Sequence, residues 1–191
     1  MNRILIVLCA LFILSCNSVE TDTNSSSEAP IIKDTIHSFD KKQMLSYIRE
    51  SEDRLLKDAG KRPVDLMAAQ SLISQYETFI KQFPTDSVTP SYLFKQGELC
   101  IAVKNGKKAA DCFIRIINDF KSSSKLPHAL YMCGFVHDDM LNEDDAARLY
   151  YERLIKECPQ HELCESAKFA LKNLGKSDEQ LIREFEKKNK R

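Results

Sequence analysis

The stretch TPSYLFKQGELCIAVKNGKKAADCFIRIINDF, residues 89–120, carries the pattern on which the fold prediction depends. Its spacing returns 37 residues later in HALYMCGFVHDDMLNEDDAARLYYERLIKEC, residues 128–158. The matched pairs are Leu93 and Leu130, Gly97 and Gly134, Asn105 and Asn142, Ala109 and Ala146, and Phe113 and Tyr150. The same interval runs backwards from Phe113 to Tyr76 and from Phe120 to Phe83. Recurrence at a fixed interval indicates repeated structural units.

Each unit predicts two helices joined by a short turn. In the later unit, one helix face is marked by the spacing i, i+3, i+4, i+7 of Leu130, Cys133, Gly134 and His137. Asn142 precedes three acidic residues and is the expected N-cap of the second helix. The buried face of that second helix is expected to carry Ala146, Leu149, Tyr150 and Leu154. We expect the glycine to let the two helices approach closely, with the alanine at the contact and the aromatic ring beside it.

This pattern resembles the tetratricopeptide repeat, although the usual period of that family is about 34 residues. The longer unit, ending in a pair such as Phe83-Pro84, is similar to the variant found in envelope lipoproteins. That group includes the BamD-type lipoprotein of the β-barrel assembly machine and the periplasmic coordinators linked to the Tol–Pal system. The resemblance covers roughly residues 64–175. It implies an all-α fold, a helical solenoid of about eight helices.

The predicted repeat domain spans residues 39–191, with clean repeats at about 90–122 and 127–159. The flanking units diverge from the pattern. Lys61-Arg62-Pro63 interrupts the first of them, and residues 161–189 form a degenerate last one. In the last unit, Ser177-x-x-Gln180 is a capping box that opens a final helix.

The N-terminus indicates a lipoprotein signal. A basic start at residues 1–3 precedes eleven uninterrupted apolar residues, 4–14, whereas about 20 are needed to span a bilayer. The run fits the apolar region of a signal peptide and ends in Ser15-Cys16, which resembles the lipobox of bacterial lipoproteins. The resemblance implies that residues 1–15 are removed and that Cys16 carries the lipid. An ordinary cleaved signal peptide with a coincidental cysteine is the alternative.

Residues 16–38 begin with a polar, acidic stretch that lacks large apolar side chains, so we expect a flexible tether there. In the lipoprotein family, Asp directly after the lipidated Cys favours retention in the inner membrane. Here that residue is Asn17, which favours the outer membrane, with the domain facing the periplasm.

The charge distribution and the motifs of the sequence argue against a nucleic-acid-binding protein and against an enzyme. The chain has 28 basic and 28 acidic residues, interspersed, so the basic face typical of nucleic-acid-binding proteins is not expected. The sequence has no nucleophile elbow, no His-Glu-x-x-His motif and no phosphate-binding loop. We therefore predict a protein that is not an enzyme and has no cofactor and no metal.

A partner surface is expected on the other face of each leading helix, where repeats of this kind bind extended or helical segments. Its predicted members are Phe94, Glu98, Ile101, Tyr131, Met132, Phe135, Asp138 and Asp139. The alternative is that Tyr131 and Phe135 only pack against the next repeat or against the N-terminal helix.

Five cysteines follow Cys16, in a pattern without CxxC pairs. Cys158 and Cys164 flank a predicted helix–helix turn and form the candidate disulfide, since the predicted compartment is oxidising. A metal site using His161 is a weaker alternative. Cys100, Cys112 and Cys133 are expected to be small buried apolar side chains.

These observations predict a membrane-anchored scaffold that binds other envelope proteins or their peptide segments, with a role in outer-membrane or envelope assembly. The alternative is a ligand-capture lipoprotein that serves nutrient uptake. A redox or metal protein is a third possibility.

Overall fold

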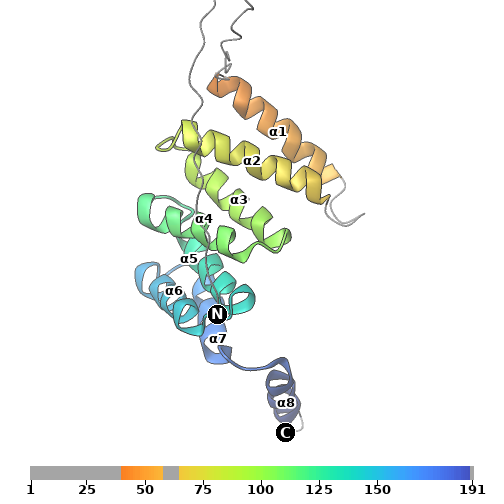
Figure 1. Ribbon diagram of the computed structural model, residues 1–191. Coiled ribbons are helices and arrows are strands. Elements are labelled where there is room, and N and C mark those ends of the chain that lie inside the picture. The colour runs from red at the N-terminus through yellow and green to blue at the C-terminus, as the bar shows by residue number, and fades with distance from the viewer. Residues whose placement is uncertain (1–39, 58–64, 190–191) are drawn as a thin grey trace, which may run out of the picture. The chain divides into compact units, whose positions relative to one another are not determined.

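All the regular secondary structure in residues 40–57 and 65–189, which the computed structural model describes, is helical (Figure 1). The helices are α1 (Lys41–Lys57), α2 (Leu66–Gln82), α3 (Thr89–Ala102), α4 (Gly106–Asp119), α5 (Leu126–Phe135), the π-helix η1 (Val136–Met140), α6 (Asp144–Glu157), α7 (Leu163–Asn173) and α8 (Asp178–Asn189). The all-α prediction is confirmed for these residues.

Helices adjacent in sequence pack against one another from α1 to α7, and α5 also contacts α7. The closest pairs are the hairpins α3–α4 and α5–α6. A continuous apolar core follows this order. It includes the fully buried side chains of Ile48, Phe79, Phe113, Leu130 and Leu154. The burial of apolar surface between sequential helices is the main force that holds the array together.

Gly97 brings α3 and α4 together as the sequence predicts. A Cβ atom added at Gly97 would lie 2.5 Å from Phe113 Cζ, so the phenyl ring occupies the space that a side chain would need. Ala109 is fully buried in the same hairpin. Phe94 packs on the Phe113 ring, with 5.4 Å between the ring centroids.

The second hairpin departs from the 37-residue interval because η1 adds one residue before α6. Gly134 faces Tyr151 rather than Tyr150: an added Cβ would lie 2.6 Å from Tyr151 Cε1. The interval from Gly97 to Gly134 is 37 residues, but that from Phe113 to Tyr151 is 38. The extra residue therefore rotates the whole of α6 by one position relative to the prediction.

Three predicted positions in this hairpin are wrong for the same reason. The N-cap of α6 is Glu143, while Asn142 adopts a left-handed conformation with a φ of 55°. Ala147 rather than Ala146 is the fully buried alanine. Leu149, expected on the buried face, is 53% exposed.

In the turn before α3, Val88 is the N-cap and Thr89 is the first residue of the helix. The Thr89 hydroxyl donates to the Phe83 carbonyl at 2.6 Å. The capping box at the start of α8 is confirmed. The Ser177 amide donates to Gln180 Oε1 at 3.1 Å, and the Gln180 amide donates to Ser177 Oγ at 3.4 Å.

The predicted signal peptide (1–15), Cys16, the tether (16–38) and the interruption at residues 61–63 lie outside the described residues. Within the described part of the chain, no helix is both long enough and apolar enough to cross a membrane.

Lys104 and Asn142 occupy equivalent left-handed turn positions, with φ values of 59° and 55°. Asn adopts this conformation more readily than Lys, so Lys104→Asn is expected to raise the free energy of unfolding by about 0.5–1 kcal/mol. The reverse change, Asn142→Lys, is expected to lower it by a similar amount. Urea unfolding of both variants measures the two effects, and equal signs for the two changes would contradict the turn assignment.

Candidate functional site

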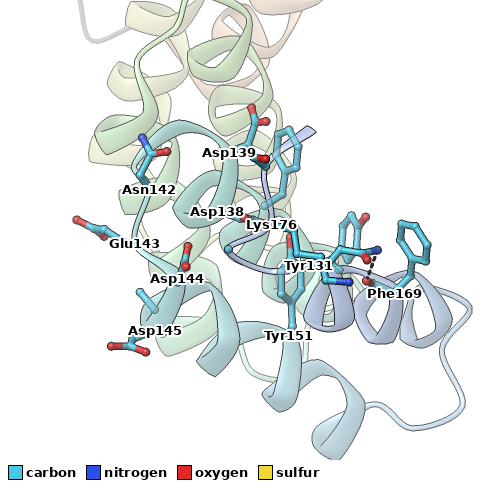
Figure 2. A pocket seen from close by; sticks show the side chains of 16 residues that line it. Tyr131, Asp138, Asp139, Asn142, Glu143, Asp144, Asp145, Tyr151, Phe169 and Lys176 are labelled. Atoms are coloured by element: carbon cyan, nitrogen blue, oxygen red, sulfur yellow. Dashed lines mark hydrogen bonds between the residues drawn. The ribbon is translucent and has the colours of Figure 1, made fainter. Parts of the chain in front are cut away.

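In the described part of the chain, a wide depression of about 1340 Å³ opens beside the second hairpin. Its walls come from α5, η1, α6, α7 and the connection from α7 to α8 (Figure 2). The lining residues are Tyr131, Phe135, Asp138, Asp139, Asn142, Glu143, Asp144, Asp145, Ala146, Tyr151, Phe169, Ala170, Asn173, Gly175, Lys176 and Ser177. Aromatic and acidic side chains dominate this set, and we call it the aromatic–acidic groove.

Four aromatic rings provide the apolar part of the groove. Tyr151 is buried at its base and contacts the Tyr131 ring, with 5.7 Å between the centroids. Phe135 is half-buried. Phe169 on α7 is 71% exposed, so most of its phenyl ring is open to solvent. The groove therefore offers both a packed aromatic base and an unpacked ring.

Five carboxylates share the groove with a single lysine, Lys176. Figure 2 shows Glu143, Asp144 and Asp145 on one side and the Tyr131 and Phe169 rings on the other. Burial raises the pKa of Asp138, and the neighbouring charges of Asp144 and Asp139 raise it further. The groove is therefore a region of negative potential beside exposed apolar surface.

Within the π-helix η1, Asp138 and Asp139 face the groove, whereas the preceding residue, His137, does not. His137 turns inward and is nearly buried, and its Nδ1 lies 2.7 Å from Glu143 Oε2. Its ring stacks on Tyr150 at 5.3 Å between centroids. With His137 held in this way, Asp138 and Asp139 lie on the groove side.

Gly175 places the α7–α8 connection against the start of α6. Its φ of +75° suits glycine, and an added Cβ would lie 2.7 Å from Asp144 Oδ2. The connection therefore passes close to the Asp144 carboxylate, and Gly175, Lys176 and Ser177 line the groove.

The structure divides the partner surface predicted from the sequence. Tyr131, Phe135, Asp138 and Asp139 all line the groove. Met132 is half-buried and is not among the lining residues.

The three predicted residues on α3 do not join them. Phe94 is buried against Phe113 and the His128 ring, so it offers little surface to a partner. Ile101 is half-buried outside the groove. Glu98 lines a separate cavity of about 230 Å³ between α1, α2 and α3. Burial raises the pKa of Glu98.

Sequence reasoning missed Phe169, Tyr151 and the three acids of residues 143–145 as members of the groove. The 37-residue interval pairs Phe169 with Met132, which does not line the groove, whereas the extra residue of η1 makes Phe169, 38 residues on, the equivalent of Tyr131 in the last unit. Tyr151 was missed because the π-helix shifts the register. In the sequence, the three acids indicate only the start of a helix.

The five described cysteines are free thiols. The candidate disulfide between Cys158 and Cys164 is not formed, and the Cys164 thiol instead donates to the Cys158 carbonyl oxygen at 3.1 Å. Among the described residues, no group of three or more His, Cys, Asp and Glu side chains is arranged to hold a metal ion.

Asp138→Asn is expected to stabilise the protein at neutral pH. A carboxyl group whose pKa is raised on folding loses stability when it ionises, so the penalty is present above the folded pKa. The advantage of Asn should shrink as the pH falls through that pKa and vanish below the unfolded value of about 3.9. Urea unfolding of the variant and the wild type at a series of pH values measures this. Asp53→Asn, at an exposed position on α1, is the control, and equal pH profiles for the two variants would contradict the assignment.

No family model matches the chain, and no curated protein is significantly similar to it in sequence.

Proposed function

We propose that this protein is a lipid-anchored scaffold of the bacterial envelope whose aromatic–acidic groove binds a basic, apolar segment of another protein. The observation that carries the proposal is the groove itself. It sets five carboxylates beside four aromatic rings and leaves Phe169 largely exposed. Exposed aromatic surface rimmed by charge is characteristic of protein interaction sites.

The hairpin geometry supports a tetratricopeptide-type array as the framework of this scaffold. In both central hairpins a glycine on the first helix contacts an aromatic ring on the second, Gly97 with Phe113 and Gly134 with Tyr151. Each helix packs on its neighbours in the chain. Proteins built in this way present rows of side chains from successive units to extended or helical partners.

Charge complementarity indicates which kind of segment the groove binds. A segment rich in Lys or Arg meets favourable potential along Asp138, Asp139 and Asp144, and its apolar side chains contact Tyr131 and Phe169. An acidic segment would be repelled. We propose a role in outer-membrane or envelope assembly, on the basis of the resemblance of Ser15-Cys16 to a lipobox and of the repeats to those of envelope lipoproteins.

The groove is tested with two synthetic amphipathic peptides, one carrying lysine and leucine and the other glutamate and leucine. We expect the lysine peptide to bind, with an affinity that falls as salt rises, and the glutamate peptide not to bind. Neutralising Asp138 and Asp139 together to Asn should weaken binding about three- to tenfold. Phe169→Ala should weaken it about tenfold.

The matched control is Glu50→Gln with Asp53→Asn, which removes two exposed carboxylates from α1. The same loss of affinity in this control would show that binding follows net charge alone, and the groove would then have no role. Circular dichroism of each variant checks that the helices are retained.

The anchor is tested separately with Cys16→Ala. We expect the variant to leave the membrane fraction and the detergent phase, because it lacks the acyl chains that hold the protein there. Unchanged partitioning would contradict the lipobox assignment while leaving the groove proposal intact.

A further inference from the structure

A small cavity of about 230 Å³ lies between α1, α2 and α3, apart from the aromatic–acidic groove. It is lined by three leucines, one tyrosine and three charged side chains, and we call it the Glu98 cavity after the glutamate among them. Pockets that hold drug-sized molecules usually have volumes of about 300–1,000 Å³. The Glu98 cavity therefore suits a single side chain or a ligand of similar size.

The apolar part of the lining comes from all three helices. Leu72 and Tyr76 on α2 are buried, each with 2% exposure. Leu55 on α1 and Leu99 on α3 are only half-buried. The two half-buried leucines leave apolar surface at which a ligand gains free energy by burying its own apolar atoms.

Two of the three charged residues in the cavity neutralise each other. The Lys95 ammonium donates to Glu52 Oε1 at 2.8 Å. The Tyr76 hydroxyl donates to the same oxygen at 2.7 Å. The charge of Glu52 is therefore balanced within the protein, and Lys95 is held at this carboxylate.

Glu98 is the charge that remains. Among the described residues, none donates a hydrogen bond to its carboxylate or forms an ion pair with it. The Lys125 and Lys95 charges lower the pKa of Glu98, but the loss of surrounding water raises it more. Lys125 is engaged elsewhere, because its ammonium lies over the Phe94 ring, 5.1 Å from the centroid. The cavity therefore has one negative charge in excess beside apolar surface.

An alkyl chain that ends in an ammonium group complements both features. Its methylene groups lie along the leucines, and its ammonium reaches the Glu98 carboxylate while it stays in contact with water, as lysine side chains do on protein surfaces. A neutral apolar ligand would leave the Glu98 charge without a partner, and an anion would be repelled by it.

We propose that the Glu98 cavity binds the side chain of a lysine from a partner polypeptide. Glu98 follows Gly97 on α3 as Phe135 follows Gly134 on α5, and Phe135 lines the groove. The cavity and the groove thus belong to corresponding faces of successive units, so that one basic segment can reach both. The polypeptide source rests on the proposed function above, whereas the preference for an alkylammonium group is a property of the cavity alone.

The first experiment titrates n-butylammonium into the full chain, purified in a neutral detergent with isotope-labelled leucine methyl groups. We expect saturable shifts of the methyl signals of Leu55, Leu72 and Leu99, with a dissociation constant in the millimolar range. n-Butanol, which has the same chain without the charge, should bind about two- to fivefold more weakly. The absence of saturable shifts at these leucines, or equal affinities for the two probes, would overturn the proposal.

Glu98→Gln tests the carboxylate itself. The variant should bind n-butylammonium about two- to fivefold more weakly, the contribution of a partly exposed ion pair, and should bind n-butanol as the wild type does. Glu50→Gln, at an exposed position on α1, is the matched control and should change neither affinity. An equal loss in both variants, or no loss in Glu98→Gln, would contradict the assignment. The same methyl spectra show that each variant is folded.

The second experiment tests the source of the ammonium group with the lysine–leucine peptide that tests the groove. We expect the peptide to shift the Leu72 and Leu99 methyl signals and to bind Glu98→Gln about two- to fivefold more weakly. A peptide that needs Asp138 and Asp139 but leaves these leucines unshifted would overturn the polypeptide source and leave the groove intact. Shifts at the leucines that are unaffected by neutralising Asp138 and Asp139 would support the cavity and count against the groove.

Discussion

Gly97→Ala is expected to lower the free energy of unfolding by about 2 kcal/mol, although alanine is the better helix former. In an exposed helix the change would add about 1 kcal/mol of stability. Here the new Cβ would lie 2.5 Å from Phe113 Cζ and 2.6 Å from Cε1, distances that no relaxed contact allows. Phe113 is fully buried against Phe94 and cannot swing into solvent. Overpacking of a closed core typically costs about 1–3 kcal/mol.

Urea unfolding of four proteins tests this expectation: the wild type, Gly97→Ala, Phe113→Leu and the double variant. Phe113→Leu removes the ring that the new methyl group strikes, so the double variant should be less destabilised than the sum of the single changes. Additive effects, or a Gly97→Ala variant more stable than the wild type, would show that the two helices are not in close contact at this point.

Tyr151→Ala is expected to lower the free energy of unfolding by about 3–5 kcal/mol, the cost of removing a large buried ring. Tyr151 is 1% exposed and fills the space beside Gly134. The neighbouring Tyr150→Ala should cost only about 1 kcal/mol, because Tyr150 is half-buried and its main ring contact is His137.

These two variants form a matched pair, since the same residue type is removed at adjacent positions of α6. Chemical unfolding monitored by circular dichroism gives both values. A larger loss of unfolding free energy for Tyr150→Ala than for Tyr151→Ala would indicate that Tyr150 is the buried ring, as the uninterrupted 37-residue interval predicts. It would contradict the one-residue shift produced by η1.

The helical hairpins could be predicted from the sequence because each depends on a few residues with strict steric roles. Gly97 and Ala109 allow the close approach of two helices, and the aromatic residue one turn beyond the alanine fills the remaining volume. Phe83 and Phe120 both follow the last residue of a helix, at the predicted spacing. Because these constraints act between residues close together in the chain, they can be recognised in a single sequence.

The π-helix could not be predicted, because its stabilising contacts join different elements. His137 reaches Glu143 beyond the turn and Tyr150 on the next helix. Those contacts exist only after α6 has packed. An Asn at position 142 is compatible with two roles, the N-cap of the next helix and a left-handed turn residue. The sequence pattern alone favours the first, and the structure has the second.

Only part of the candidate site could be predicted, because some of its residues are brought together by packing between helices. Helical spacing placed Tyr131, Phe135, Asp138 and Asp139 on one face, and they do line one groove. Phe169 comes from the degenerate last unit, and its contribution depends on how α7 packs on α6. Phe94 satisfies the same spacing as Tyr131 but is buried, because Lys125 and His128 from the next turn and helix cover its ring.

The most direct test of the central claim is site-specific photocrosslinking in intact cells. A benzophenone amino acid replaces Phe169 in the groove or, as the control, Leu149, which is 53% exposed on α6 and does not line the groove. We expect a discrete protein adduct from position 169, joined through a segment with basic and apolar side chains and lost when Asp138 and Asp139 are changed to Asn. No adduct at position 169, or the same adducts from both positions, would contradict the claim that the aromatic–acidic groove binds another protein.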